Sequence, residues 1–320
     1  MSILGKLLFG QPARPAPEPD AVQRKLADLE LTLERIRQLA IMELDLRTAT
    51  ELRELRADPR YGAPGRLERH GYKVWSQNDE DGILAEIFRR IGAGRPGQPG
   101  RFVEFGVSDG RECNTLKLLV EGWQGLWMES DAASCERIRR VFAAPLAEGR
   151  LELKETSVTA ENIDGLIAGA RVAAAGELDL LSIDIDGNDY HVLKAIRSVR
   201  PRVLVIEYNG KFPPPIDLVL PYNPAHRWDG SDYAGNSLQA IANLAARRGY
   251  RLVGTNITGV NAFFVREDLV ASHFADQDVA ALFNPARFWL SPGYVSSFPT
   301  GERFNYTSDA ALEKASGSRG

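Results

Sequence analysis

The sequence predicts an α/β fold, in which a mostly parallel seven-stranded sheet ends in an antiparallel hairpin and an N-terminal helical extension precedes the sheet. Short apolar runs alternate with helix-like segments between residues 101 and 209, and such alternation forms parallel sheets with right-handed crossovers. Residues 250–255 and 262–266 are both strand-like and are separated by only a short glycine-containing segment. Because a helical crossover needs about 10–12 residues, these last two strands are expected to pair antiparallel.

Composition limits the classes of function. The chain has 320 residues, enough for one large α/β domain with attachments, and its net charge of −4 disfavours a nucleic-acid partner. Two cysteines, Cys113 and Cys135, cannot form a disulfide framework and indicate a cytoplasmic protein. No apolar run approaches the ~20 residues that a transmembrane helix requires. Residues 1–10 are either a weak peripheral anchor at the inner membrane face or a disordered terminus.

The N-terminal part of the chain predicts a linker followed by a long helix. Four prolines among residues 11–20 indicate that residues 1–20 form a flexible terminus with an extended linker. Residues 21–58 predict a helix that stops before Pro59. Apolar residues recur along it at alternating steps of four and three until Glu43 interrupts them: Val22, Leu26, Leu29, Leu33, Ile36 and Ala40. This spacing predicts either a coiled coil, and hence a homo-oligomer formed through residues 21–58, or a helix lying against its own domain.

Residues 59–300 are expected to form the main domain. Residues 301–320 are expected to form a tail that is disordered after about residue 308. Strands are expected near residues 102–103, 125–129, 151–154, 177–184, 202–209, 250–255 and 262–266. Helices are expected near residues 84–91, 114–121, 132–142, 161–168, 192–198, 237–248 and 276–283. The long segment 211–236, rich in proline and aromatic residues, is expected to be a lid or binding loop.

The turn after the first strand is the first candidate site. It reads Glu104-x-Gly106-x-x-x-Gly110, and the second strand closes with Glu129. In a doubly wound sheet such a turn lies at the carboxyl edge, where nucleotide-like ligands bind, and an acid ending the second strand accepts hydrogen bonds from ribose hydroxyls. Asp109 inside the turn suits a cationic or zwitterionic ligand better than a pyrophosphate. The alternative is an ordinary βαβ turn that binds nothing.

Several segments resemble, in order, the FkbM-type methyltransferases over about residues 72–268: SQNDEDGIL, VEFGVSDGRECNTL, GWQGLWMES, LDLLSIDIDGNDYHVLKAI, VLVIEYN and GYRLVGTNITGVNAFFVRED. The resemblance implies a Rossmann-like class I fold and S-adenosylmethionine-dependent methyl transfer, usually to an oxygen of a sugar, polysaccharide or similar hydroxylated acceptor. It also implies a set of cofactor-binding residues, with Asp184 at the edge of the active site: Ser76, Gln77, Glu104, Gly106, Ser108, Asp109, Gly110, Asn114, Glu129, Ser130 and Asp184.

Acidic residues accumulate at the same expected edge: Glu104, Asp109, Glu129, Asp184, Asp186, Asp189 and Glu207. Like charges this close need a cation, protons or hydrogen-bond donors to offset them. One candidate is the sulfonium and amino group of S-adenosylmethionine. Another is a divalent metal such as Mg²⁺, held by Asp184 or Asp186 with Glu207 and Asn209. The third explanation is that residues 186–189 form only a turn and a helix N-cap.

The expected chemistry is an in-line displacement at carbon, in which alignment of the two reactants provides most of the rate. Asp184, Asp186 or His191 is the candidate catalytic group that takes the acceptor's proton. His191 is also typical of a surface residue in a first helical turn, and His226 is a weaker candidate of the same kind. Two rival readings are a non-catalytic scaffold and an NAD-dependent oxidoreductase. The glycine spacing and the final hairpin disfavour the oxidoreductase.

Overall fold

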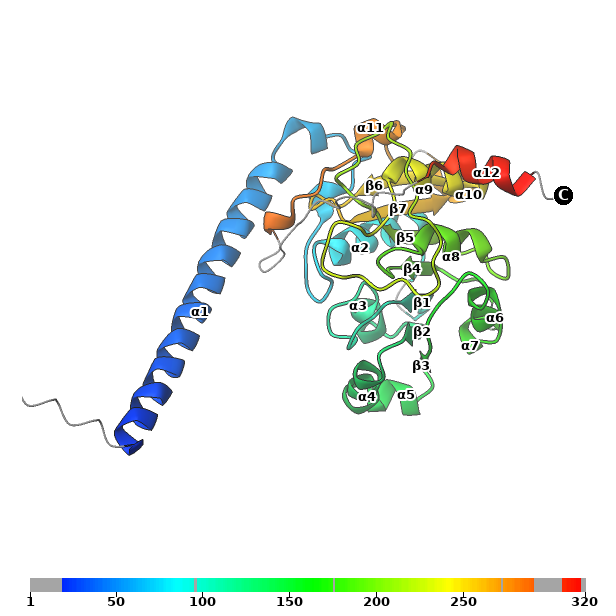
Figure 1. The fold of residues 1–320 in the computed structure, drawn as a ribbon. Helices are drawn as coiled ribbons and strands as arrows, with labels where there is room; N and C mark the ends of the chain where they lie inside the picture. The colour runs from blue at the N-terminus through cyan, green and yellow to red at the C-terminus, as the bar shows by residue number, and fades with distance from the viewer. Residues whose placement is uncertain (1–18, 95–96, 175, 272, 291–306, 318–320) are drawn as a thin grey trace, which may run out of the picture. The chain divides into compact units, whose positions relative to one another are not determined.

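The computed structural model describes residues 19–94, 97–174, 176–271, 273–290 and 307–317 (Figure 1). The chain divides into two units, residues 1–50 and residues 51–320. The expectations for residues 1–18 and for a domain boundary at residue 300 fall outside the described residues.

The first unit consists of most of helix α1 (Pro19–Arg56), whose last turns belong to the second unit. This confirms the long helix expected over residues 21–58. The helix contains no glycine and no proline after its first residue, and alanine, leucine, glutamate and arginine, all strong helix formers, dominate it. Ion pairs between Arg37 and Glu34 and between Arg47 and Glu43 lie along its surface. None of the helices in the described part of the chain has the length and apolarity needed to cross a bilayer.

The second unit is built on a seven-stranded sheet with the order β3-β2-β1-β4-β5-β7-β6 (Figure 1). Strands β1 to β5 are parallel, and β7 is antiparallel to both β5 and β6, as the sequence predicts. The strands are β1 (Arg101–Phe105), β2 (Gln124–Glu129), β3 (Leu151–Glu155), β4 (Leu180–Ile183), β5 (Val203–Glu207), β6 (Tyr250–Thr255) and β7 (Asn261–Arg266).

Helices pack on both faces of the sheet and form two core layers. One layer lies under α6 (Ile163–Ala168), α7 (Arg171–Ala174), α8 (Asp189–Ala195) and α9 (Leu238–Arg247). The other lies under α2 (Glu80–Ile91), α3 (Leu116–Val120) and α4 (Ala132–Val141). Short helices complete the unit: η2 (Pro59–Tyr61), η3 (Glu68–His70), α5 (Ala143–Ala147), α10 (Glu267–Val270), α11 (Val279–Leu282), η4 (Phe288–Leu290) and α12 (Asp309–Gly317).

The alternation of side chains in β1 explains how one strand serves both layers. Val103 and Phe105 pack into the layer of α8 and α9, and Phe102 packs into the layer of α2 and α3. Each large apolar side chain buried in this way stabilises the fold by about 1.5–3 kcal/mol. Glu104 points to the same face as Phe102, since side chains two residues apart in a strand share a face. That face is the one α3 covers.

The expected disorder after residue 308 is wrong. Residues 309–317 form α12, and the buried carboxylate of Asp309 accepts hydrogen bonds from Arg247 at 2.5 and 2.7 Å and from the hydroxyl of Tyr190. The prediction of disorder failed because the segment carries few apolar residues. An ion pair between Asp309 and Arg247 on α9 holds the segment in place instead. The structure also contains short helices, α5, α7 and α10, that the sequence pattern does not predict.

Candidate functional site

The turn after β1 brings the backbone close to the end of β4. Gly106 has a φ of +81°, and a Cβ added there would lie 1.6 Å from the carbonyl oxygen of Asp184. No side chain fits in that space, so glycine is required by both conformation and contact. Ser108 also has a positive φ of 49°, a conformation that non-glycine residues hold mainly at functional sites.

Glu129 ends β2 beside this turn. One carboxylate oxygen of Glu129 accepts a hydrogen bond from the backbone N–H of Ser108 at 2.8 Å. The other accepts from the backbone N–H groups of Ser130 at 2.7 Å and Asp131 at 2.8 Å. These three bonds fix the carboxylate at the carboxyl edge of the sheet and tie it to the glycine turn. The oxygen that meets Ser108 retains a lone pair for a further donor, such as a ligand hydroxyl.

Glu104 has a different position from the one expected of a ligand-binding residue. Its carboxylate is buried and accepts hydrogen bonds from the backbone N–H groups of Asn114 at 2.9 Å and Thr115 at 3.1 Å. The hydroxyl groups of Thr115 and Ser182 also donate to it. Glu104 therefore holds the segment that leads into α3, and its effect on the site is one of positioning.

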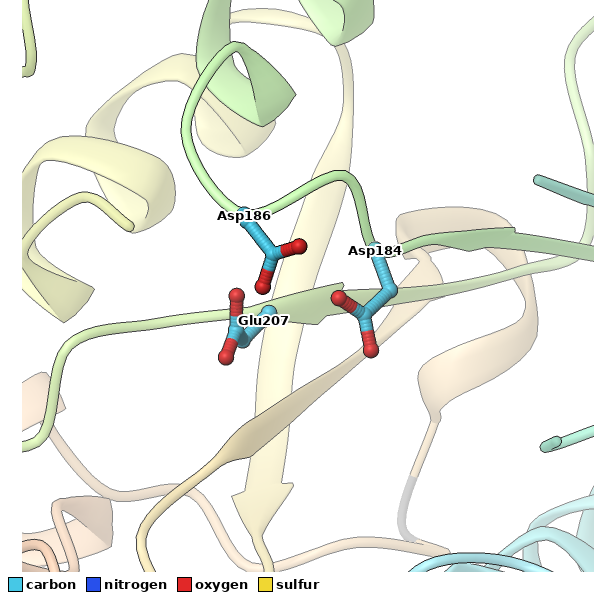
Figure 2. Close-up of side chains that lie close together, drawn as sticks. All are labelled: Asp184, Asp186 and Glu207. Atoms are coloured by element: carbon cyan, nitrogen blue, oxygen red, sulfur yellow. The ribbon is translucent and has the colours of Figure 1, made fainter. Parts of the chain in front are cut away.

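Three carboxylates meet where β4 and β5 end (Figure 2). Asp184 follows β4, Glu207 ends β5, and Asp186 lies in the intervening turn with a φ of +61°. One oxygen of each lies within 4.8 Å of one oxygen of each other residue. Asp189 shapes this turn, because its carboxylate accepts hydrogen bonds at 2.9 Å from the backbone N–H groups of Ile185 and Gly187. The turn thus places the carboxylates of Asp184 and Asp186 beside that of Glu207.

Burial and mutual repulsion change the protonation of this cluster. Burial, and then the charges of Asp186 and Asp189, raise the pKa of Asp184 well above its usual range. Burial and the neighbouring Asp184 do the same to the pKa of Glu207. Burial raises the pKa of Asp186, while nearby His226 lowers it. One oxygen of Glu207 is buried and accepts no hydrogen bond from the described residues. The cluster therefore favours protons or a cation among the carboxylates.

Two pockets open at this edge of the sheet. The first, named here the glycine pocket, is lined by Gly106, Ser108, Met128, Glu129, Ser130, Asp131, Ser134, Thr156, Ser157, Val158, Asp184, Ile185, Asp186, Asn188, Pro224, His226, Arg227 and Trp228. The second, the acid pocket, is lined by Gln77, Asn78, Asp184, Asp186, Glu207, Tyr208, Asn209, Trp228, Asp232, Ala234, Gly235, Val260 and Phe288. Asp184, Asp186 and Trp228 line both, so the two pockets meet at these three residues.

Most of the expected site residues line these pockets, and some do not. Those that line one or both are Gln77, Gly106, Ser108, Glu129, Ser130, Asp184, Asp186, Glu207 and Asn209. Those that line neither are Ser76, Glu104, Asp109, Gly110, Asn114 and His191.

The residues outside the pockets have partners of their own. A Cβ at Gly110 would meet Trp127 at 2.8 Å, so this glycine serves packing. Asp109 pairs with Arg111 and Arg137. The Nε2 of His191 lies 2.8 Å from the carbonyl oxygen of Leu220. Burial lowers the pKa of His191. Because its ring contacts Leu220 and lines neither pocket, the geometry does not favour His191 as the catalytic base.

Ser76 and Asn114 are buried and bonded within the protein. The hydroxyl of Ser76 accepts a hydrogen bond from the backbone N–H of Asp81, and the side-chain amide of Asn114 donates to Ser182 at 3.0 Å. Asn209 lines the acid pocket, but its side-chain oxygen already accepts from the backbone N–H of Lys211 at 3.1 Å. Asn209 is therefore a poorer metal ligand than the three carboxylates.

The long loop 211–236, expected to be a lid or binding loop, contributes the candidate His226 to the pockets, together with Trp228 and Asp232, which no motif indicated. His226 lines the glycine pocket, and its buried Nε2 has no hydrogen-bond partner among the described residues. A Cβ on Gly187 would lie 2.6 Å from the His226 ring, which explains the glycine beside Asp186. Trp228 and Asp232 line the acid pocket. The unusual length of the loop and its aromatic content were the available signals.

Residues 92–252 match the family model described as the methyltransferase FkbM domain, which covers half of the chain. The chain belongs to the FkbM methyltransferase family. The sheet ends in the antiparallel hairpin expected for a Rossmann-like class I methyltransferase fold, so both the resemblance and the fold class that the sequence predicts are confirmed.

Solved methyltransferases are also similar to this chain. A putative caffeoyl-CoA O-methyltransferase from Staphylococcus aureus shares 11% identity over 57% of this chain and 81% of its own, with a TM-score of 0.40. Magnesium protoporphyrin IX methyltransferase from Synechocystis PCC 6803, solved with bound SAM, shares 12% identity over 66% and 89%, with a TM-score of 0.35. An O-methyltransferase family protein from Burkholderia thailandensis shares 14% identity over 57% and 55%, with a TM-score of 0.37. No curated protein matches the chain.

Proposed function

We propose that this FkbM domain transfers a methyl group from S-adenosylmethionine to a hydroxyl oxygen of a sugar or glycan. The observation that carries the proposal is the meeting of two pockets at Asp184, Asp186 and Trp228. A group-transfer enzyme needs two binding sites that bring donor and acceptor atoms into line. The glycine pocket suits the donor, and the acid pocket suits the acceptor.

The glycine pocket has the features that a nucleoside-bearing donor requires. Gly106 lines this pocket without a side chain, so its backbone can approach a ligand closely. Glu129 is held in place by three backbone N–H groups, and its remaining lone pair can accept a ribose hydroxyl. The acids Asp184 and Asp186 line the same pocket and favour a positively charged sulfonium and amino group.

The acid pocket has the features that a hydroxylated acceptor requires. Carboxylate oxygens of Asp184, Asp186 and Glu207 accept hydrogen bonds from hydroxyl groups, and Trp228 and Phe288 offer apolar ring faces. In the reaction the acceptor oxygen bonds to the methyl carbon as the carbon–sulfur bond breaks. The hydroxyl proton passes to the ionised carboxylate of Asp184 or Asp186, which binds a proton more tightly than an ordinary carboxylate because its pKa is raised.

The same carboxylates also fit Mg²⁺, which we propose as a second cation of this site. Three acidic oxygens lie within 4.8 Å of one another, and one Glu207 oxygen is buried without a partner among the described residues. Magnesium prefers such oxygen ligands. When bound, the metal would lower the pKa of the acceptor hydroxyl, with Asp184, Asp186 and Glu207 as its ligands.

Calorimetric titration with S-adenosylhomocysteine tests the donor site. We expect micromolar binding by the wild type, and binding weaker by about 10- to 100-fold for Glu129→Ala, since a hydrogen bond to a charged group contributes about 1.5–3 kcal/mol. Glu155→Ala is the matched control, because Glu155 is the register partner of Glu129 on β3 and lines neither pocket.

Equal affinity of Glu129→Ala and wild type would remove Glu129 from the site. NADH binding in place of S-adenosylhomocysteine would favour the hypothesis that the protein is an NAD-dependent oxidoreductase. Absence of binding by both ligands would favour a non-catalytic scaffold.

A further inference from the structure

Helix α1 presents an apolar stripe that continues past the Glu43 interruption. The stripe consists of Val22, Leu26, Leu29, Leu33, Ile36, Ala40 and Leu44, at steps of four, three, four, three, four and four. At 3.6 residues per turn these residues fall within a sector about 80° wide on a straight helix. Exposed fractions range from 40% at Val22 to 64% at Leu33. Such a continuous stripe is typical of a helix with a partner.

The extra step of four explains how the stripe stays continuous. Val22, Leu33 and Leu44 are spaced by eleven residues, and an eleven-residue repeat has about 3.67 residues per turn. This value is close to that of an unstrained α-helix, so the stripe runs almost straight along the helix. Glu43 stands where the next step of three would fall, and Leu44, at a step of four, continues the stripe instead. The stripe then spans about 33 Å of helix.

We propose that a second copy of this chain covers the stripe, with the two α1 helices parallel and in register. The flanking charges support this occupant. Leu26 takes position a and Leu29 position d of a heptad, so Lys25 is at g and Glu30 at e. In a parallel pair, each g residue faces the e residue five places further along the partner helix. Lys25 of one copy then faces Glu30 of the other, and the reverse, so two opposite-charge pairs form. An antiparallel pair sets like positions against each other and loses the Lys25–Glu30 match, but it can set Glu30 against Arg37 of the partner, so the two orientations predict different charge pairs.

The helix also supplies a matched control. Leu26 and Leu31 are both leucines on the same helix, and each is 53% exposed. Leu26 lies in the stripe, whereas Leu31 lies about 180° from Val22, on the opposite side of the helix. A charge introduced at the two positions has the same effect on helix propensity and solubility. Because Leu31 lies with Leu39, Met42 and Leu46 in a second exposed apolar sector, a difference in association between the variants shows which of the two sectors the partner covers.

The test is sedimentation equilibrium of the full chain at micromolar concentrations. We expect a dimer for the wild type and for Leu31→Glu, and a monomer, or association weakened at least tenfold, for Leu26→Glu. S-adenosylhomocysteine affinity is measured on all three proteins to show that the second unit is folded. A monomeric wild type, or equal association of the two variants, would overturn the proposal. Because the oligomeric state and cofactor binding are separate readouts, failure of this proposal is distinct from failure of the proposed function.

Orientation is tested by cross-linking at a seam position. Leu29→Cys is expected to form an intermolecular disulfide on mild oxidation, since parallel helices in register place the two residues 29 side by side, whereas Leu31→Cys is not. The native Cys113 and Cys135 are buried and do not compete. Lys25→Glu should weaken the dimer, and adding Glu30→Lys should restore it. A dimer that shows neither the disulfide nor the charge rescue contradicts the parallel arrangement.

Discussion

Glu104 and Glu129 show how one residue type takes two roles at the end of neighbouring strands. Both are acids on parallel strands beside the same turn, and the resemblance assigns both to the cofactor. The Glu129 carboxylate lines the glycine pocket, whereas the Glu104 carboxylate is used by the N–H and hydroxyl groups of residues 114, 115 and 182. Both side chains point to the same face of the sheet, because Glu104 is in register with Trp127 and Glu129 lies two residues after Trp127. The difference follows from position along the strands, since Glu104 lies under the segment that leads into α3, whereas Glu129 is the last residue of β2 at the carboxyl edge.

Gly106 is the residue where the site is least tolerant of change. Gly106→Ala is expected to destabilise the protein by about 2 kcal/mol or more and to remove S-adenosylhomocysteine binding, because its Cβ would overlap the backbone of Asp184 in a left-handed conformation. Urea unfolding and calorimetric titration measure the two effects.

Gly122 separates strain from overlap. It has a φ of +93°, and a Cβ there would meet nothing within 4 Å. Gly122→Ala should therefore cost only the conformational strain, about 1 kcal/mol, and leave ligand affinity unchanged. Equal losses in the two variants would show that the contact with Asp184 has no consequence.

At the scale of elements, α12 shows that an ion pair can order a polar segment. Asp309 is buried, and Arg247 on α9 and Tyr190 on α8 both donate hydrogen bonds to it. Figure 1 shows α12 in red beside α9. Arg247 is itself about 39% exposed, so solvent weakens the pair relative to a fully buried one.

Asp309→Ala is expected to lower the free energy of unfolding by about 1–3 kcal/mol, since Tyr190 and Arg247 lose their acceptor. Urea unfolding of the full chain measures this loss. Glu313→Ala is the control, because Glu313 pairs with Lys194 and Arg247 at the surface and is about 40% exposed. Its loss should be under about 1 kcal/mol. Similar values for the two variants would contradict an anchoring role for Asp309.

At the scale of the whole molecule, the acid cluster has a cost for folding that a cation can offset. The pKa values of Asp184, Asp186 and Glu207 are raised, and that of Asp189 is raised to about 6 from 3.8. A folded-state pKa above the unfolded value means that the folded protein binds more protons, so stability falls as pH rises through this range. For Asp189 the window runs from about pH 4 to about pH 6.

Magnesium binding should show the opposite dependence on pH, because carboxylates must lose their protons to become ligands. We expect Mg²⁺ to raise the melting temperature more at about pH 8 than at about pH 5, as measured by calorimetry. Glu207→Gln should remove most of the increase, while Glu155→Gln, at a strand end outside both pockets, should retain it. A pH-independent increase, or an unchanged increase in Glu207→Gln, would argue against this metal site.

Much of the fold and part of the site follow from local sequence. The alternation of apolar runs with helical segments determines a parallel sheet, and the short 256–260 turn between β6 and β7 determines the antiparallel hairpin. Acids and glycines at strand ends point to the carboxyl edge, because connectivity places all those ends on one side. Gly106, Glu129, Asp184, Asp186 and Glu207 were therefore predictable as pocket residues.

Which of the expected residues line the pockets depends on the tertiary structure. Local pattern locates Glu104, Asn114 and His191 near the site, but their partners are 10 to 78 residues away in the chain. Likewise, His226 and Trp228 join the pockets through a loop without regular structure, whose path depends on packing rather than on periodicity. The order of apolar runs, helical segments and turns along the chain was enough to predict the sheet and the edge at which the pockets open, since both follow from local pattern and connectivity. The division between binding and supporting residues depends on long-range contacts, which only the folded chain creates.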